Sequence, residues 1–146
     1  MAFYQKHLHA LWFCLLGLIG IINLISCDEE GEETLISRNF STESHRAGED
    51  CLFCHQPNND ADGWFRVAGT VYEANGLDPA PNGVVRFFRQ PGGEADLVMR
   101  LEVDGKGNFY TTEPLEFDDG LEVEVENTAG DIFRMQGLVT TGACNT

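Results

Sequence analysis

The chain has 146 residues, of which 42% are hydrophobic, and its formal net charge at pH 7 is −15. A surface this acidic argues against nucleic-acid binding and against electrostatic docking on anionic lipid, because both ligands are themselves negative. It suits a soluble domain, or one that docks on basic partners. The length provides for one small domain with its own core and not for two.

The first segment has the pattern of an export signal. An apolar run from Ala10 to Ile25 follows Lys6, and its roughly 16 residues are fewer than the 20 or so that a membrane-spanning helix needs. The run ends in Leu24-Ile25-Ser26-Cys27, which resembles the lipobox of bacterial lipoproteins. The resemblance implies that a signal peptide over residues 1–26 is removed and that Cys27 carries a lipid. An uncleaved N-terminal anchor is the alternative, and both interpretations place the rest of the chain in the cell envelope, outside the cytoplasm.

An acidic stretch, Asp28-Glu29-Glu30-Gly31-Glu32-Glu33, follows the lipobox cysteine, and polar residues dominate up to about Gly48. Mutual repulsion of the charges and the scarcity of apolar side chains disfavour a packed structure. We therefore predict an acidic flexible tether over residues 27–47.

The next segment, residues 48–63, contains the CxxCH motif Cys51-Leu52-Phe53-Cys54-His55 and is called the CxxCH segment below. Two thiols at this spacing can add across the two vinyl groups of a haem, and the histidine that follows can bind the iron as its proximal ligand. Covalent haem attachment in bacteria takes place outside the cytoplasm, so the motif and the export signal support each other. We expect one covalent haem c, held by Cys51, Cys54 and His55.

Two other interpretations of the motif remain open. The cysteine pair could form a disulfide or a thiol redox pair, although thioredoxin-type sites begin a helix in a βαβ fold, which the rest of the chain does not predict. The pair could also belong to a structural metal knuckle, with His45 or Cys144 as the fourth ligand.

The sixth position on the iron has one candidate histidine. His45 is the only other histidine after the lipobox, and it could fold back over the haem as the distal ligand. Met99 and Met135 are rival ligands, but each lies on the apolar face of an expected strand and is predicted to fill the core. Three aromatic residues could shield a haem edge, although at such a junction they more often simply pack: Phe53, Trp64 and Phe65.

From Trp64 onward, strand-like runs alternate with turn signals such as Asn75-Gly76 and Asp104-Gly105. The expected strands are Phe65 to Tyr72, Val84 to Phe88, Leu97 to Val103, Asn108 to Thr112, Leu121 to Val125 and Ile132 to Met135. Apolar and charged residues alternate from Leu97 to Val103, as expected for a sheet with one buried and one solvated face. The prediction is an all-β fold, a small antiparallel sandwich of about seven strands over residues 64–141.

Three stretches of this region resemble carboxypeptidase-regulatory-like domains: Val67-Ala68-Gly69-Thr70-Val71-Tyr72, Pro81-Asn82-Gly83-Val84-Val85-Arg86-Phe87 and Asp104-Gly105-Lys106-Gly107-Asn108-Phe109. Those domains are transthyretin-like or immunoglobulin-like sandwiches and are usually non-catalytic, so the resemblance implies no active site. The order of parts also resembles extracytoplasmic proteins in which a CxxCH segment precedes such a sandwich and a second CxxCH closes the chain. The tail over residues 142–146, which contains Cys144, looks like that second motif cut before its second cysteine and histidine.

The sequence therefore predicts a lipid-anchored electron-transfer protein with one c-type haem, and not an enzyme. Its expected partners are extracytoplasmic redox proteins, basic or multihaem, and the membrane through the lipid anchor, but not nucleic acid. The alternative is a surface lipoprotein whose sandwich binds protein or carbohydrate while the cysteine pair forms a disulfide. Several acidic residues could suggest calcium, but they match no EF-hand spacing and suit turns: Asp60, Asp62, Asp118 and Asp119.

Overall fold

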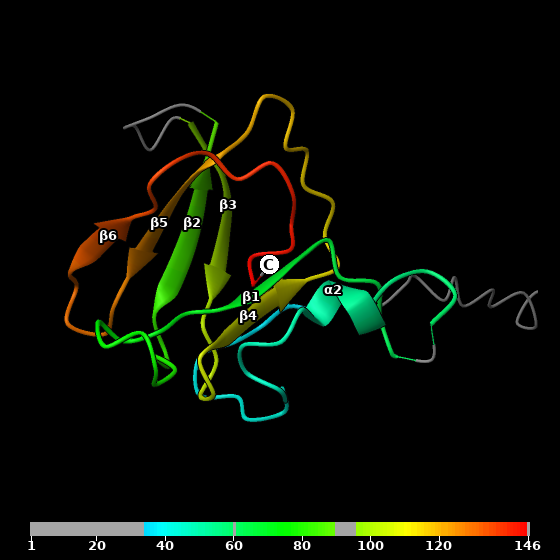
Figure 1. Ribbon diagram of the computed structural model, residues 1–146, viewed down its shortest axis with the longest axis horizontal. Coiled ribbons are helices and arrows are strands. Elements are labelled where there is room, and N and C mark those ends of the chain that lie inside the picture. Colours follow the sequence, from blue (N-terminus) through cyan, green and yellow to red (C-terminus); the bar gives the residue numbers. More distant parts are fainter. Residues whose placement is uncertain (1–33, 60, 90–95, 146) are drawn as a thin grey trace, which may run out of the picture. The chain divides into compact units, whose positions relative to one another are not determined.

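The computed structural model describes residues 34–59, 61–89 and 96–145, so the expected signal peptide, Cys27 and Asp60 lie outside the described residues. In this part of the chain, six strands form two antiparallel sheets, and the only α-helix is the single turn α2 (Cys51–Cys54) (Figure 1). The predicted all-β, sandwich-like fold is confirmed.

The strands form where branched and aromatic residues gather between turns, because such side chains suit a pleated and half-buried surface. One sheet has the strand order β3-β2-β5-β6, and the other pairs β1 with β4. Their bounds lie within a few residues of the predicted runs: β1 (Val67–Thr70), β2 (Val84–Phe88), β3 (Leu97–Glu102), β4 (Asn108–Thr111), β5 (Glu122–Glu126) and β6 (Ile132–Arg134).

The smaller sheet is flanked on both edges by short segments that are not named strands. Ile36 forms an antiparallel bridge with Thr111 of β4, and Ala143 forms a parallel bridge with Ala68 of β1. In Figure 1 the red C-terminal segment accordingly runs beside β1. Residues 34–47 were predicted to be part of a flexible tether, but they lie along the sandwich. Backbone hydrogen bonds between this segment and the open edge of β4 hold it there.

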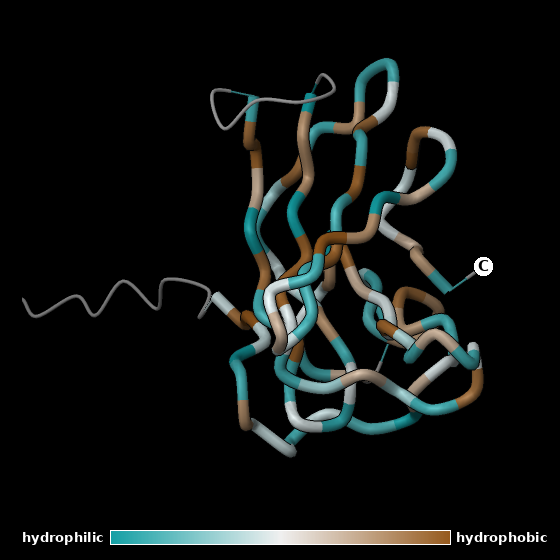
Figure 2. The backbone as a smooth tube through the Cα atoms, turned by 90° about the vertical axis from the view of Figure 1, so that its left-hand side faces the viewer, coloured by the Kyte–Doolittle hydropathy of each residue, from teal (hydrophilic) through white to brown (hydrophobic). Residues whose placement is uncertain are grey.

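The core lies between the two sheets. Phe87 from the larger sheet and Phe109 from the smaller one meet with ring centroids 6.5 Å apart. On β3 the predicted alternation is confirmed, since Met99 and Leu101 are buried while Arg100 is exposed, and Figure 2 shows hydrophobic and hydrophilic positions alternating along the strands. Burying each large apolar side chain contributes about 1.5–3 kcal/mol. The central cluster consists of Val67, Val85, Phe87, Met99, Leu101, Val103, Phe109, Leu121 and Val123.

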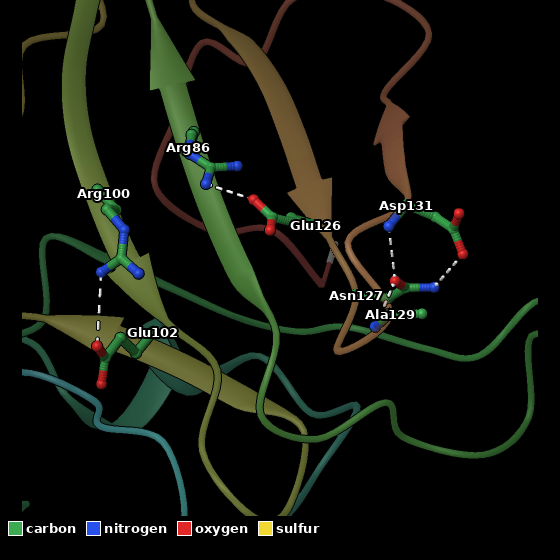
Figure 3. A network of polar contacts seen from close by, with 7 residues as sticks. All are labelled: Arg86, Arg100, Glu102, Glu126, Asn127, Ala129 and Asp131. Atoms are coloured by element: carbon green, nitrogen blue, oxygen red, sulfur yellow. Dashed lines mark hydrogen bonds and ion pairs between the residues drawn. The ribbon is translucent and has the colours of Figure 1, made fainter.

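The opposite face of the larger sheet is polar. Figure 3 shows Arg86 of β2 paired with Glu126 of β5, and Arg100 paired with Glu102 along β3 at 3.5 Å. Ion pairs near the surface contribute only about 0–1 kcal/mol each, so they identify the solvated side of the sheet without holding it together.

The expected strand from Ile132 to Met135 is less buried than predicted. This methionine was expected to fill the core, but its side chain is 46% exposed, and Phe133 on β6 is 56% exposed. The cause is the unequal width of the sheets, because β6 is the outer strand of the four-stranded sheet and the two-stranded sheet leaves it uncovered. An apolar groove of about 490 Å³ lies beneath β6, and its lining includes Phe133, Met135, Val125 and Cys144.

Candidate functional site

The three candidate side chains of the CxxCH motif lie on one helical turn and its C-cap. Asp50 caps this turn by accepting a hydrogen bond from the Leu52 N–H at 3.0 Å, and the His55 N–H closes it by donating to the Cys51 carbonyl at 3.0 Å. Residues three apart on a helix lie on the same side, so Cys51 and Cys54 lie near each other, beside His55. Both cysteines are free thiols, Cys51 half-buried and Cys54 exposed.

The imidazole of His55 is fixed in one tautomer. Its Nδ1 lies 2.8 Å from the carbonyl oxygen of Asp62 and 3.3 Å from that of Gly63. Because a carbonyl oxygen only accepts hydrogen bonds, Nδ1 carries the proton, and the lone pair on Nε2 is available to a metal. Metal-binding histidines almost always commit their second nitrogen to such an acceptor, which orients the ring and increases its basicity.

Aromatic packing fixes the plane of the same ring. Phe65 stacks on His55 with ring centroids 4.0 Å apart and planes inclined by 10°. Phe65 also stacks on Tyr110, with ring centroids 4.8 Å apart. Burial raises the pKa of the Tyr110 hydroxyl, and the negative charges of Asp104 and Glu43 raise it further, so this side chain stays neutral. The two aromatic residues attach the CxxCH segment to the sandwich at β4.

The ring of His45 lies near that of His55. Their ring centroids are 6.1 Å apart and the ring planes are inclined by 36°. Two histidines on one iron have nitrogens about 2 Å from the metal, and each nitrogen is about 1 Å from its ring centre, so the centroids lie about 6 Å apart. A separation of this size would allow one iron to bind both rings.

A cavity of about 190 Å³ joins these side chains, and its lining includes His45, His55, Cys51, Cys54 and Tyr110. It is smaller than the roughly 300–1,000 Å³ of pockets that enclose drug-sized ligands. These side chains are the donors that a covalent haem would use: two thiols, one histidine directly after them, and a second histidine in the same cavity.

Cys51 lacks the lowered pKa of a thioredoxin-type nucleophile. Burial raises the pKa of Cys51, and the negative charges of Asp50, Cys54 and Glu49 raise it further, despite the opposing hydrogen bond to a backbone group. Reactive cysteines in such enzymes have a lowered pKa instead. For the metal knuckle, no group of three or more His, Cys, Asp or Glu side chains in the described part of the chain could hold a metal ion.

Of the other described residues predicted to contact a haem, only Phe65 lies at the site. Met99 is buried in the core, as predicted, and Met135 lies in the groove beneath β6, so neither methionine lines the cavity of the two histidines. Of the aromatic candidates, Phe65 is the one that contacts a site residue. The ring of Trp64 is instead covered by the guanidinium of Arg66 at 3.4 Å, and Phe53 is exposed.

Comparison with protein-family models, with curated proteins and with solved structures found no match for this chain. Among the described residues, no helix has the length and apolar character needed to cross a membrane. The site is therefore interpreted from its own chemistry.

Three contributors to this site could not be identified from the sequence. They are the carbonyl of Asp62, which accepts from His55, and the side chains of Asn108 and Tyr110, which line the cavity. One signal for the last two was available. Asn108 and Tyr110 alternate with Phe109 on β4, so they occupy the face of the smaller sheet that points away from the core.

Proposed function

We propose that this protein is an electron carrier of the bacterial cell envelope with one covalent c-type haem. Cys51 and Cys54 form the thioethers, His55 is the proximal iron ligand, and His45 is the distal ligand. A lipid on Cys27 anchors the chain, and the sandwich, which resembles a carboxypeptidase-regulatory-like domain, is a non-catalytic scaffold. The partners are basic or multihaem redox proteins outside the cytoplasm.

The observation that supports this proposal most strongly is the pair of histidines. The two imidazoles lie with their ring centroids 6.1 Å apart, a separation that would allow one iron to bind both, in a cavity that both motif thiols also line. A haem bound there supplies reversible one-electron exchange at its iron.

The protein's own residues perform the binding and the orientation. Cys51 and Cys54 would hold the haem covalently through thioether bonds, and His55 would bind its iron. The hydrogen bond from Nδ1 to the Asp62 carbonyl would leave the Nε2 of His55 for the metal, and the Phe65 ring covers one face of the imidazole.

The acidic surface favours basic redox partners. The net charge of −15 on the whole chain steers positively charged proteins towards it and increases their rate of association at low salt.

The test combines a pyridine haemochrome spectrum with the intact mass of the mature protein, made together with the bacterial haem-attachment machinery. A c-type spectrum and the added mass of one haem are expected, and both are expected to disappear in the Cys51→Ser/Cys54→Ser double variant. A colourless wild-type protein would refute the proposal, particularly if it were two protons lighter than its reduced form.

One observation favours the second candidate, a surface lipoprotein whose sandwich binds protein or carbohydrate. The apolar groove beneath β6 is larger than the cavity at the histidines, and two of its lining residues, Phe133 and Met135, are exposed. In that case the Cys51→Ser/Cys54→Ser variant would keep its full binding activity, whereas loss of binding in the variant would count against this candidate.

A further inference from the structure

His45 is held near His55 by residues of the sandwich and not by secondary structure of its own. His45 is exposed and lies in a segment without regular secondary structure, between the bridge at Ile36 and the helical turn α2. Its placement depends on hydrogen bonds from the sandwich. Asn108, the first residue of β4, donates from its side-chain amide to the Ser44 hydroxyl at 2.9 Å and to the His45 carbonyl at 3.4 Å.

Asn108 is itself held firmly. Its side chain is only 2% exposed, and its backbone N–H donates to Oδ1 of Asp104 at 3.0 Å. Its side-chain oxygen accepts the hydroxyl proton of Thr70 at 2.7 Å. Thr70 is the residue that pairs with Asn108 across β1 and β4.

The orientation of the Asn108 amide follows from the bonds of Thr70. The Thr70 hydroxyl oxygen accepts from the Gly48 N–H at 2.8 Å and from the Asn145 side-chain amide at 3.2 Å. A hydroxyl has one proton, and with its acceptor sites in use that proton goes to the oxygen of Asn108. The NH₂ group of Asn108 must therefore point towards Ser44 and His45.

The same network also holds the other end of the segment. The Asn145 amide donates to the Glu49 carbonyl at 3.0 Å, two residues before Cys51. Asn108, Thr70 and Asn145 thus fix the backbone from Ser44 to Glu49, which connects the distal histidine to the motif.

From this arrangement we infer that Asn108 is a positioning residue for the distal ligand. Through Ser44 and the His45 carbonyl it sets the separation of the two imidazoles, and it thereby decides how completely His45 occupies the sixth position. Asn108 does not contact the iron. The inference depends on the proposed function, because it assigns a role at the proposed haem.

The test measures how well carbon monoxide competes with His45 for the ferrous iron. The haem-loaded Asn108→Asp variant keeps an oxygen for the Thr70 hydroxyl but loses both donated bonds. If these bonds stabilise the His45-bound form as ordinary hydrogen bonds do, carbon monoxide affinity should rise about tenfold, with a matching increase in five-coordinate, high-spin iron. The Ser44→Ala variant removes one of the bonds without altering a buried residue, and should raise the affinity about threefold.

The matched control is Asn127→Asp, which removes an amide donor from the β5–β6 hairpin, where Asn127 donates to Asp131 at 3.0 Å. This variant should keep the wild-type carbon monoxide affinity. His45→Ala sets the upper limit of the effect.

The outcomes separate the two proposals. A wild-type protein without covalent haem refutes the proposed function and the inference with it. Covalent haem together with an unchanged affinity in His45→Ala overturns the inference and the assignment of His45 as the distal ligand, while the covalent haem carrier stands. A clear effect of His45→Ala when Ser44→Ala and Asn108→Asp both match the wild type overturns the inference alone.

Discussion

Replacing Asp104 by alanine should destabilise the protein by about 2–3 kcal/mol and loosen the segment that contains His45. Asp104 is fully buried, and its Oδ1 accepts from the Lys106 N–H at 2.8 Å and from the Asn108 N–H at 3.0 Å. A buried donor left without a partner costs about 1–3 kcal/mol.

The magnitude follows from the surroundings of each donor. Lys106 is exposed, so water can replace the lost bond to its N–H at little cost. Asn108 is buried, so its N–H bears most of the penalty. The lost packing of the side chain adds to the cost, while removal of a buried carboxylate, whose Oδ2 has no hydrogen-bond partner among the described residues, offsets part of it.

Urea denaturation followed by far-ultraviolet circular dichroism measures the free energy of unfolding. Asp104→Asn is the matched control, because an amide oxygen can accept the same two bonds, and it should stay within about 1 kcal/mol of the wild type. Equal destabilisation of the two variants would show that the charge matters and not the acceptor. A loss below about 0.5 kcal/mol in Asp104→Ala would refute the reasoning altogether.

Three further predictions concern the rest of the described chain. In the haem-free chain, where Cys51 is a free thiol, burial and next the negative charge of Cys51 raise the pKa of Cys144 to about 11 from an ordinary value near 9. The unfolded thiol therefore ionises first, and Cys144 should lower folding stability by up to about 2–3 kcal/mol as pH rises from about 9 to about 11. Urea titrations across that range should show a smaller loss in Cys144→Ala, and identical pH profiles would contradict this. A Cβ on Gly142 would overlap the carbonyl oxygen of Arg66, so Gly142→Ala should release the C-terminal segment from β1. Hydrogen exchange at the Ala68 and Cys144 amides should then accelerate, whereas the neighbouring exposed change Thr141→Ala should leave it unaltered. Met99→Ala should cost about 2–5 kcal/mol of unfolding free energy and Met135→Ala less than about 1, because only Met99 is buried in the core. Similar losses in the two variants would mean that the groove beneath β6 is covered.

The strands could be predicted because their signals are local. On β3, the alternation of Met99 and Leu101 with Arg100 identifies the buried face without knowledge of any partner strand. The burial of β6 could not be predicted in this way. Phe133 and Met135 have the pattern of a half-buried strand, but their exposure depends on the width of the facing sheet, which no local pattern encodes.

The site was predictable in composition but not in arrangement. The CxxCH motif identifies two thiols and one histidine, and His45 followed by elimination, as the remaining histidine after the lipobox. The sequence gives no sign that residues 34–47 lie along β4, because their attachment depends on long-range bonds such as the one between Asn108 and Ser44. That bond connects residues 64 positions apart in the chain.

The most direct test of the central claim, that His55 and His45 bind one iron, is the electron paramagnetic resonance spectrum of the ferric protein. The wild type should show low-spin iron with two axial imidazoles, and His45→Ala should convert it to high-spin iron while leaving the covalently bound haem in place. A high-spin wild type, or a low-spin spectrum that survives in His45→Ala, would contradict the account.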